Sequence, residues 1–472
     1  MIQTSDPMPP RVCIIGAGAT GLCHAYRLSQ TSASLRVLET SSRVGGVVQT
    51  FQENGFLAEA GPHSLRYKHR AIAHLLDEMG LEEEIVEPTS YAKKRFLVKN
   101  SQLLSAPRSP LSLLTTPLLS GRAKLRLLRE PWIPPLREGG EESLAAFVSR
   151  RLGQEVLEQL LEPMVGGIYA GDPHQLSARY AFPSLYDWEN KHGSLIRGAF
   201  QSMRQRKKDP QAIPTRIVAF RQGMQTLVDR IAGSLPLNSL RRDVQLQSIE
   251  QLALSKAKEG ENTAGAEPVW RIRWEEDKRA QSEDFDALFI AVPAFRLKTL
   301  PWQGFDHRPW EGLDTIEHPP VTIMTLGFRR EDVQHPLDGF GALISAQEGY
   351  NILGVIFASS LFPHRAPKDH VTLSVFLGGT RSPERGLASL EIQEAMALQD
   401  LRRLLGVSGK VRWRHRMVWS KAIPQYNLGY GRFMQAIEQS EAAYPGLHLV
   451  GNYRTGISLA QCLLNGLGSI KK

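Results

Sequence analysis

The residues near the amino end whose types and spacing suggest chemistry form a glycine turn. Gly16-Ala17-Gly18-Ala19-Thr20-Gly21 follows a short apolar run at 11–15 and precedes a helix-like apolar pattern at 22–30. In such a strand–turn–helix unit the first glycine permits the tight turn, the second lets backbone approach a pyrophosphate, and the third lets helix and strand pack closely. The helix start then presents its positive dipole to the phosphates. The turn predicts a dinucleotide site.

An acidic residue supports this prediction. Glu39 follows Gly21 after seventeen intervening residues, at the end of a second predicted strand at 35–39. At that place its carboxylate can accept hydrogen bonds from both ribose hydroxyls. An acid instead of a basic residue argues against a cofactor with a 2′-phosphate.

Two further segments favour FAD over a nicotinamide cofactor. Ser42-Arg43-Val44-Gly45-Gly46 comes directly after the acid, where paired glycines let backbone run along a long cofactor and Arg43 can neutralise phosphate. Near the other end, a strand leads to Gly451-Asn452, and Gly456-Ile457-Ser458 opens an apolar helix. That helix start can place a positive dipole beside the flavin ring and stabilise its reduced anion. The turn at 451–456 contains no cysteine, so we expect non-covalent FAD.

Length and composition indicate how many domains position these segments and exclude some classes of protein. The chain has 472 residues, of which 42% are hydrophobic and 22% charged, which is enough for two or three domains with sizeable cores. Three cysteines, none in CxxC spacing, exclude a disulfide framework and argue against a zinc module, so we expect no metal site.

Hydrophobic periodicity indicates an α/β protein with a further helical part. We expect a helix at 71–85, a mainly helical region from 107 to 200, and strands between 243 and 300 interrupted by a polar loop at 255–268. Strands at 321–328 and 371–377, a helix at 387–405 and a strand–turn–helix at 447–464 complete the pattern.

The net charge of +9 favours acidic partners such as an anionic membrane face or a polyanionic small molecule. No uncharged apolar run reaches the length of a spanning helix. Residues 1–11 resemble neither a signal nor a transit peptide and are expected to form a disordered leader. We therefore expect a cytoplasmic protein, peripheral on a membrane at most.

Two basic clusters could serve such a membrane contact. Arg122, Lys124, Arg126 and Arg129 recur among leucines before Pro131-Trp132-Ile133, the composition of an interfacial helix. A solvated helix face is the alternative interpretation. The second cluster, at 204–208, is expected to be a loop. Neither cluster has interleaved aromatic residues, which excludes nucleic acid as a partner.

Several blocks along the chain resemble flavin-dependent protoporphyrinogen oxidases, within the amine-oxidase-like superfamily. The resemblance extends from Val12 to about Gly466. It rests on the blocks at 55–64, 162–172, 181–185, 191–196, 223–227, 422–429 and 451–453. The substrate class comes from these blocks, since composition and spacing alone indicate only an FAD protein.

The resemblance implies an α/β (α+β) fold in three parts. A Rossmann-like FAD domain of the amine-oxidase-like type would be assembled from residues 11–90, 206–300 and 413–472. A substrate domain with a mixed or antiparallel sheet would comprise 91–107 and 301–412, and 108–205 would be a helical, membrane-associating domain. A homodimer and a peripheral membrane contact would also be compatible with this family.

The resemblance also implies which residues bind the cofactor and the substrate, by their positions in the matching blocks. The FAD residues are expected to be Gly16, Ala17, Gly18, Ala19, Thr20, Gly21, Glu39, Thr40, Arg43, Gly45, Gly46, Val47, Gly61, Pro62, His63, Ser64, Val244, Trp419, Gly451, Asn452, Gly456, Ile457 and Ser458. For the substrate, the resemblance implies that Arg95 pairs with a propionate, that Leu343 and Phe376 sandwich the macrocycle, and that Gly167 lies near the pyrrole nitrogens. Without the resemblance, Leu343 and Phe376 would be read as core. A solvated basic turn is the alternative interpretation of Arg95, and a plain turn glycine that of Gly167.

The implied reaction is the oxidation of protoporphyrinogen IX to protoporphyrin IX in haem or chlorophyll synthesis. A hydride leaves a saturated meso carbon for the flavin, three two-electron rounds follow, and O2 reoxidises the flavin to give H2O2. No protein general base is nominated. His63 lies close to the expected flavin, but many family members carry arginine there, so we expect His63 to position groups instead of transferring protons.

Three alternatives stay open at this point. Coproporphyrinogen III, with four propionates, could be the substrate of the same reaction, although Arg95 favours protoporphyrinogen. An amine oxidase or a carotenoid desaturase is disfavoured by the blocks at 166–172 and 424–429. A non-catalytic relative that has lost its flavin is disfavoured by the intact turns at 16–21 and 451–458.

Overall fold

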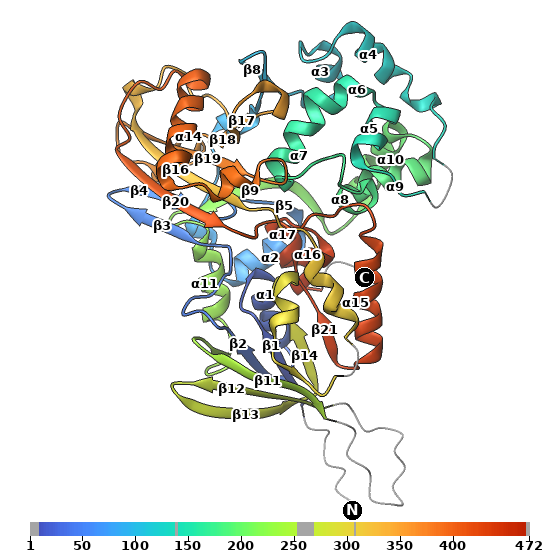
Figure 1. Cartoon of the computed structure of the whole chain (residues 1–472), viewed down its shortest axis with the longest axis vertical. Coiled ribbons are helices and arrows are strands. Elements are labelled where there is room, and N and C mark those ends of the chain that lie inside the picture. Colours follow the sequence, from blue (N-terminus) through green and yellow to red (C-terminus); the bar gives the residue numbers. More distant parts are fainter. Residues whose placement is uncertain (1–8, 137–139, 253–268, 306–307, 469–472) are drawn as a thin grey trace, which may run out of the picture.

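The structure is a computed structural model and describes residues 9–136, 140–252, 269–305 and 308–468. The loop predicted at 255–268 and residues 1–8 of the predicted leader lie outside this part of the chain. The described chain divides into a lower half built on a parallel sheet and an upper half that combines a mixed sheet with a cluster of helices (Figure 1).

The lower half contains a five-stranded parallel sheet drawn from distant parts of the chain. Its order is β10 (Leu240–Arg241), β2 (Ser34–Leu38), β1 (Arg11–Ile15), β14 (Ala287–Ile290) and β21 (Leu447–Leu449). Helices α1 (Ala19–Ser29), α2 (Arg70–Glu78), α11 (Gln225–Gly233) and α17 (Leu459–Gly466) share one apolar core with it. The central strand β1 is apolar at every position from Val12 to Ile15 because both of its faces are covered.

Smaller elements flank the parallel sheet. A four-stranded sheet, β13 (Arg279–Phe285), β12 (Val269–Glu276), β11 (Gln245–Leu252) and β15 (Trp302–Gln303), closes one end (Figure 1). Helix α15 (Gly431–Ala443) contacts β21, and α16 (Asn452–Thr455) contacts α17. The hairpin β3 (Thr50–Glu53)–β4 (Phe56–Glu59) and the sheet of β5 (Leu65–His69), β9 (Ala212–Phe220) and β6 (Ile85–Val86) join the two halves.

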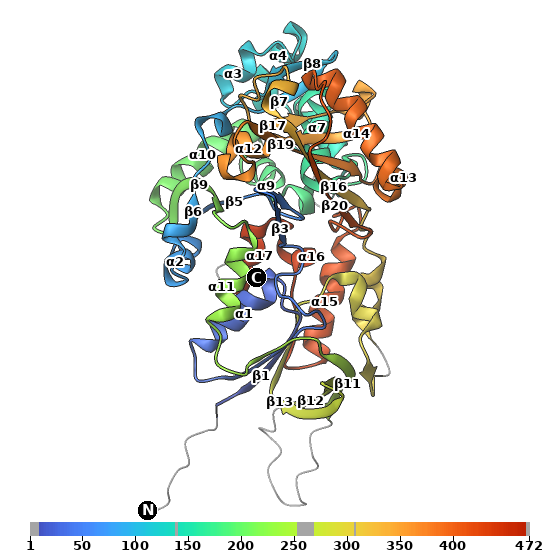
Figure 2. The ribbon, with the colours of Figure 1, turned by 90° about the vertical axis from the view of Figure 1, so that its left-hand side faces the viewer.

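The upper half contains a seven-stranded mixed sheet. Its order is β20 (Trp413–Trp419), β16 (Val321–Arg329), β19 (His370–Gly378), β18 (Ile352–Ile356), β17 (Gly341–Leu343), β7 (Phe96–Lys99) and β8 (Gln102–Ser105). Helix α14 (Leu390–Leu405) shares an apolar core with one face of this sheet. The short helices α12 (Ala358–Leu361) and α13 (Pro383–Leu387) lie at its ends. Viewed from the side, α16 and α17 lie between this sheet and the parallel sheet (Figure 2).

The remaining helices gather beside the mixed sheet. They are α3 (Pro110–Thr115), α4 (Gly121–Leu128), α5 (Leu144–Arg151), α6 (Gln154–Val156), α7 (Glu162–Tyr169), α8 (Ala178–Ala181), α9 (Pro183–His192) and α10 (Leu195–Lys208). This agrees with the helical region expected at 107–200. Whether the domain boundaries follow the predicted residues stays a prediction.

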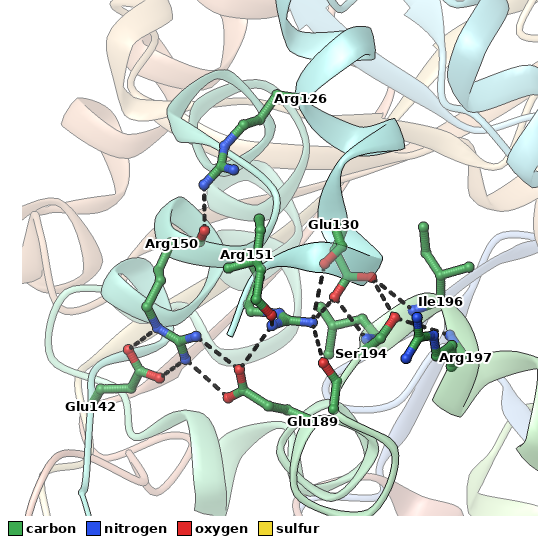
Figure 3. Close-up of polar contacts among 12 residues, drawn as sticks. Arg126, Glu130, Glu142, Arg150, Arg151, Glu189, Ser194, Ile196 and Arg197 are labelled. Carbon is green, nitrogen blue, oxygen red and sulfur yellow. Dashed lines mark hydrogen bonds and ion pairs between the residues drawn. The ribbon is translucent and has the colours of Figure 1, made fainter. Parts of the chain in front are cut away.

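A buried ionic network holds these helices together (Figure 3). The side chains of Arg151 and Glu130 are fully buried and form an ion pair, and Arg151 also donates to the Ile133 carbonyl at 2.6 Å. Glu130 accepts hydrogen bonds from Ser194 Oγ and from the Leu195 backbone N–H, at the start of α10. Each charge is thus compensated by several partners, which a buried ion pair requires.

Four expectations about elements are wrong in detail. The helix expected at 71–85 ends at Glu78, because Gly80 takes a left-handed φ of +61° and the chain turns toward β6. The helix expected at 387–405 begins at Leu390, where Ser389 caps it. The first helix begins at Ala19 instead of Leu22. Residues 204–208, expected to be a loop, are the last residues of α10, since arginine and lysine are good helix formers and stabilise a helix carboxyl end.

Candidate active site

The three glycines of the turn at 16–21 have two different roles. Gly16 has a φ of +103°, and a Cβ atom there would lie 2.9 Å from the Ala291 carbonyl oxygen. A Cβ atom on Gly21 would lie 2.0 Å from the Gly16 carbonyl oxygen, so both positions need glycine for the fold itself. Gly18 has an ordinary φ of −71°, and a Cβ atom there would meet nothing within 4 Å. The space beside Gly18 is therefore open, as a pyrophosphate would require.

Glu39 lies against this turn. Its Oε2 accepts a hydrogen bond from the Ala17 N–H at 2.8 Å, and its Oε1 accepts one from the Ser41 N–H at 2.9 Å. The backbone N–H of buried Val244 donates to the Glu39 carbonyl at 3.2 Å. The expected ribose and adenine residues are thus adjacent, and Thr40 lies beside them.

The segment at 42–47 runs along the glycine turn. Gly45 donates to the Ala17 carbonyl at 2.8 Å, and both Gly45 and Gly46 have a positive φ. Arg43 donates to the Gly46 carbonyl at 2.7 Å and to the Val44 carbonyl at 3.2 Å. Arg43 therefore holds this loop in place, and its contact with phosphate stays a prediction.

The last segment of the chain also lies close to the glycine turn at 16–21. Helix α17 lies so close to α1 that a Cβ atom on Gly466 would be 2.4 Å from Cys23 Cβ. Ser458 caps α17 in a reciprocal capping box with Gln461. Before it, the Asn452 carbonyl accepts a hydrogen bond from Tyr426 Oη. The start of α17, with Gly456 and Ile457, is thereby fixed near the first glycine turn.

The segment at 60–64 links the lower half to the mixed sheet. Trp419, at the end of β20, donates through Nε1 to the Ala60 carbonyl at 2.6 Å. A Cβ atom on Gly61 would lie 2.2 Å from the Val47 carbonyl oxygen, and the Val47 side chain is exposed. Pro62, His63 and Ser64 follow. These predicted flavin residues therefore converge from three separate segments.

Two buried charges that the sequence analysis did not single out support this segment. Arg365 lies 3.3 Å from Glu59 and donates to the His63 carbonyl at 2.7 Å. Glu59 also accepts hydrogen bonds from Thr50 Oγ1 and the Met224 N–H. Glu59 lies within the block at 55–64, which could have pointed to it, whereas nothing in the sequence around Arg365 links Arg365 to this segment.

His63 is buried as a neutral ring. Its Nδ1 lies 3.1 Å from the Gly61 carbonyl, and its buried Nε2 has no hydrogen-bond partner among the described residues. Burial, with the nearby Arg365 charge, lowers the pKa of His63 to about 3. Protein atoms enclose this nitrogen, so a contact of His63 with the flavin stays a prediction.

This pKa gives a prediction for the pH dependence of turnover. Because His63 titrates near pH 3 and not near 6.5, it stays neutral between pH 5 and pH 9 and contributes no inflection to the pH–rate profile in that interval. His63→Asn should change the rate uniformly across that interval without changing the profile's shape. Steady-state rates of both proteins at matched pH values test this. An inflection near pH 6 to 7 that His63→Asn removes would show that His63 does titrate there.

The predicted substrate residues lie in one row across the mixed sheet. Leu343 in β17 is opposite Gly354 in β18, and Gly354 is opposite Phe376 in β19. Residues directly opposite each other share a face of a sheet. Their neighbours Ala342, Val355 and Val375 point to the core under α14, so the row faces the other way.

Two residues of this row are less buried than the strands around them. Phe376 and Leu343 are only half-buried, although the rest of β19 from Val371 to Gly378 is buried. Gly167 in α7 lies across from the row, since a Cβ atom there would be 2.4 Å from Leu343 Cδ2. The rings of His63 and Phe376 are 5.6 Å apart, which connects the row to the flavin segment. Gly354, which the sequence analysis missed, lies between these two residues, and Leu343 packs over it, since a Cβ atom on Gly354 would lie 3.4 Å from Leu343 Cδ2.

Arg95 lies at the other end of this row. Leu97 is in register with Leu343, and the Arg95 carbonyl accepts a hydrogen bond from the Ala106 N–H at 2.8 Å, which continues the β7–β8 ladder. The Arg95 guanidinium lies 4.9 Å from the centre of the Phe340 ring and lines a surface hollow of about 420 Å³. The structure thus brings all four predicted substrate residues to one side of the mixed sheet.

These observations define the class of protein. A parallel sheet whose first turn is open at Gly18, an acid at the end of the second strand and a distant helix start at Ser458 fit FAD. The half-buried row of Leu343, Gly354 and Phe376 adjoins them. Residues 19–468 match the family described as flavin containing amine oxidoreductase. The chain belongs to this family and is an FAD-dependent oxidoreductase of the fold class predicted from the sequence.

Individual relatives cover nearly the whole chain. The chain is 31% identical to protoporphyrinogen oxidase 2, chloroplastic/mitochondrial, of Arabidopsis thaliana over 97% of this chain and 92% of that protein. It is 27% identical to coproporphyrinogen III oxidase of Bacillus subtilis over 97% of each chain. The crystal structure of a proposed protoporphyrinogen oxidase from Exiguobacterium sp. 255-15 superposes with a TM-score of 0.76 at 25% identity, covering 98% of this chain and 97% of that chain.

Proposed function

We propose that this enzyme oxidises protoporphyrinogen IX to protoporphyrin IX, with FAD as the hydride acceptor and O2 as the final oxidant. The observation that carries the proposal is the row Leu343–Gly354–Phe376, which runs from His63 beside the flavin segment toward Arg95. A half-buried apolar row that ends at a cation matches an apolar macrocycle with carboxylate side chains. The relatives named for this activity support the same substrate class.

The chain's own residues bind and orient the substrate. Leu343 and Phe376 offer apolar surface to the macrocycle, and Arg95 offers a charge-assisted hydrogen bond to a propionate. FAD, when bound, accepts two electrons with a hydride at N5 and is reoxidised by O2, so three rounds convert one porphyrinogen and three O2 to one porphyrin and three H2O2. His63 is neutral, and its backbone carbonyl accepts a hydrogen bond from Arg365. Both residues therefore hold the flavin segment in place and neither transfers a proton.

Coproporphyrinogen III remains the second candidate substrate. A relative named for that activity matches the chain over the same length at slightly lower identity. The two porphyrinogens share the macrocycle and differ in the number of propionates, so the apolar row accepts both, and discrimination must lie in charged residues.

A steady-state comparison tests this proposal. Purified enzyme is supplied in air with each porphyrinogen, and porphyrin fluorescence and H2O2 are measured together. We expect a higher kcat/KM with protoporphyrinogen IX and three H2O2 per porphyrin formed. A higher kcat/KM with coproporphyrinogen III would assign the enzyme to the second substrate, and no turnover above the spontaneous rate with either would refute the proposed reaction.

We also propose that α4 and the turn that follows it contact an anionic membrane surface. Leu125, Leu128 and Trp132 are exposed, Trp132 by 77%, and lie among basic side chains. Two residues of α4 serve the fold instead, since Leu127 is buried and Arg126 donates to the Arg150 carbonyl at 2.6 Å. Among the described residues no helix has the length and hydropathy needed to cross a membrane.

A vesicle experiment decides this membrane contact. The double variant Leu125→Glu/Trp132→Glu should lower co-flotation with phosphatidylserine vesicles by about tenfold, because it removes apolar area and adds negative charge. Leu237→Glu, at a side chain that is 92% exposed but outside the helical region, is the control and should float like the wild type. Equal flotation of all three proteins would contradict the contact.

A further inference from the structure

One arginine connects two acids that flank helix α7. Arg381 Nη1 lies 3.5 Å from Oε2 of Glu162, the first residue of α7. Its Nη2 lies 3.1 Å from Oδ1 of Asp172, three residues beyond the end of the helix. Glu162 is buried, so the cation compensates a carboxylate that water hardly reaches. The planar guanidinium suits this role because its separate N–H groups can contact two carboxylates at once.

This cluster joins α7 to the two strands that carry the apolar side chains of the substrate row. Ser345, two residues after Leu343 and the end of β17, donates through Oγ to Glu162 at 3.3 Å. Arg381 comes three residues after the end of β19, the strand that carries Phe376. The contacts of Glu162 therefore tie the start of α7 to the ends of both strands.

The two ends of α7 are held in different ways. At its carboxyl end, the Ala170 carbonyl accepts a hydrogen bond from the Thr380 N–H at 2.8 Å, and a Cβ atom on Gly379 would lie 2.5 Å from the same oxygen. Its start follows a π-helical turn at Leu157–Leu161, the kind of turn at which helices kink. Without Arg381, the start of α7 could therefore shift while its end stays attached to the mixed sheet.

A shift of α7 would alter the predicted substrate site directly. Gly167 lies in the second half of the helix, and a Cβ atom there would be 2.4 Å from Leu343 Cδ2. The helix backbone and the substrate row are thus in contact. Because a displacement of about 1 Å in a group that orients a substrate can cost a large part of the rate, the place of α7 matters for binding.

We propose that Arg381 is a positioning residue for the substrate, which sets the place of Gly167 against Leu343 by bridging Glu162 and Asp172. Both acids already occupy its guanidinium, so Arg381 acts through α7 and not by contact with the substrate. The proposal rests on the proposed function, which assigns the row of Leu343 and Phe376 to the macrocycle.

Substitutions of Arg381 test this role in the FAD-loaded enzyme. Arg381→Met should raise KM for protoporphyrinogen IX about tenfold with kcat nearly unchanged, because the misplaced helix weakens binding of ground state and transition state alike. The affinity for protoporphyrin IX, titrated by porphyrin fluorescence, should fall by the same factor. Arg381→Lys should lie between wild type and Arg381→Met, since a single ammonium is a point charge and replaces the bridge only in part. Flavin content should equal that of the wild type in both variants.

A double variant tests whether Arg381 acts through the bridge. Asp172→Asn alone should weaken porphyrin binding, but in the Arg381→Met background it should add no further loss, because both changes break the same contact. Arg271→Met is the matched control. Arg271 forms an ion pair of similar exposure with Asp284 at 2.8 Å, in the four-stranded sheet at the opposite end of the molecule (Figure 1). It should keep the wild-type KM and porphyrin affinity.

Three results would overturn the positioning role. They are Arg381→Met that matches Arg271→Met in KM and porphyrin affinity, losses from Arg381→Met and Asp172→Asn that simply add, and flavin lost in step with porphyrin affinity across Arg381→Met, Arg381→Lys and Asp172→Asn. The last result would make the cluster a support of the whole fold.

Failure of the proposed function would look different. If the wild type does not oxidise porphyrinogens, the proposed reaction fails, and the affinities of the variants for protoporphyrin IX still decide on Arg381. A wild type that also binds no porphyrin would overturn both proposals.

Discussion

Gly18→Val should yield a folded protein that binds FAD far more weakly and is purified with little flavin. Gly18 has extended backbone angles that valine adopts readily, and the space beside its Cα is open, so the fold tolerates the side chain. The same space is where the pyrophosphate would lie, and the valine methyl groups would fill it. Overpacking of this kind costs about 3 kcal/mol, which corresponds to roughly a hundredfold loss of affinity.

The measurement is the ratio of flavin absorbance to protein in the purified variant, followed by titration with FAD. Gly233→Val is the matched control, because that glycine, at the end of α11, also has open space and lies outside the predicted cofactor segments. The control should stay yellow. A yellow Gly18→Val protein with the normal flavin content would mean that the pyrophosphate does not lie at this turn.

Arg151→Met should produce the largest loss of stability. The substitution removes the cation that compensates buried Glu130 and leaves that carboxylate fully enclosed (Figure 3). It also leaves the Ile133 and Gly193 carbonyls without a donor. Breaking one side of a buried ion pair costs about 3–5 kcal/mol. We expect chemical denaturation of the variant to begin at a clearly lower denaturant concentration.

An exposed ion pair on a neighbouring helix provides the control variant for Arg151→Met. Lys191 and Asp187 lie 3.3 Å apart on α9, and both side chains are more than half exposed. Lys191→Met should change the free energy of unfolding by less than about 0.5 kcal/mol. Similar losses in both variants would mean that the network around Glu130 does not hold the helices together.

The cofactor half of the site could be predicted in detail because its signals are local. The strand at 11–15, the glycine turn and Glu39 follow one another within about thirty residues, and each has a physical reason for its residue type. The convergence of Gly451–Ser458 on the same turn could be inferred from the need of a flavin for a second helix start. The close fit of Gly466 against α1 could not, since it depends on tertiary packing.

The substrate half could not be derived from local pattern. Leu343, Gly354 and Phe376 belong to three strands, and only the register of the mixed sheet makes them one row. An exposed and a buried apolar residue look alike in a sequence, so the family resemblance was needed to select Leu343 and Phe376. Arg108 gave no signal, because its place in the same hollow as Arg95 arises from the packing of the segment before α3.

The central claim is that electrons pass from a porphyrinogen to the FAD held by this chain, and an anaerobic half-reaction tests it most directly. Purified enzyme is mixed with protoporphyrinogen IX without oxygen, and the flavin absorbance is followed together with porphyrin fluorescence. We predict that the flavin bleaches, and that admitted O2 restores its colour and releases H2O2. Flavin that stays oxidised with both protoporphyrinogen IX and coproporphyrinogen III would contradict the account.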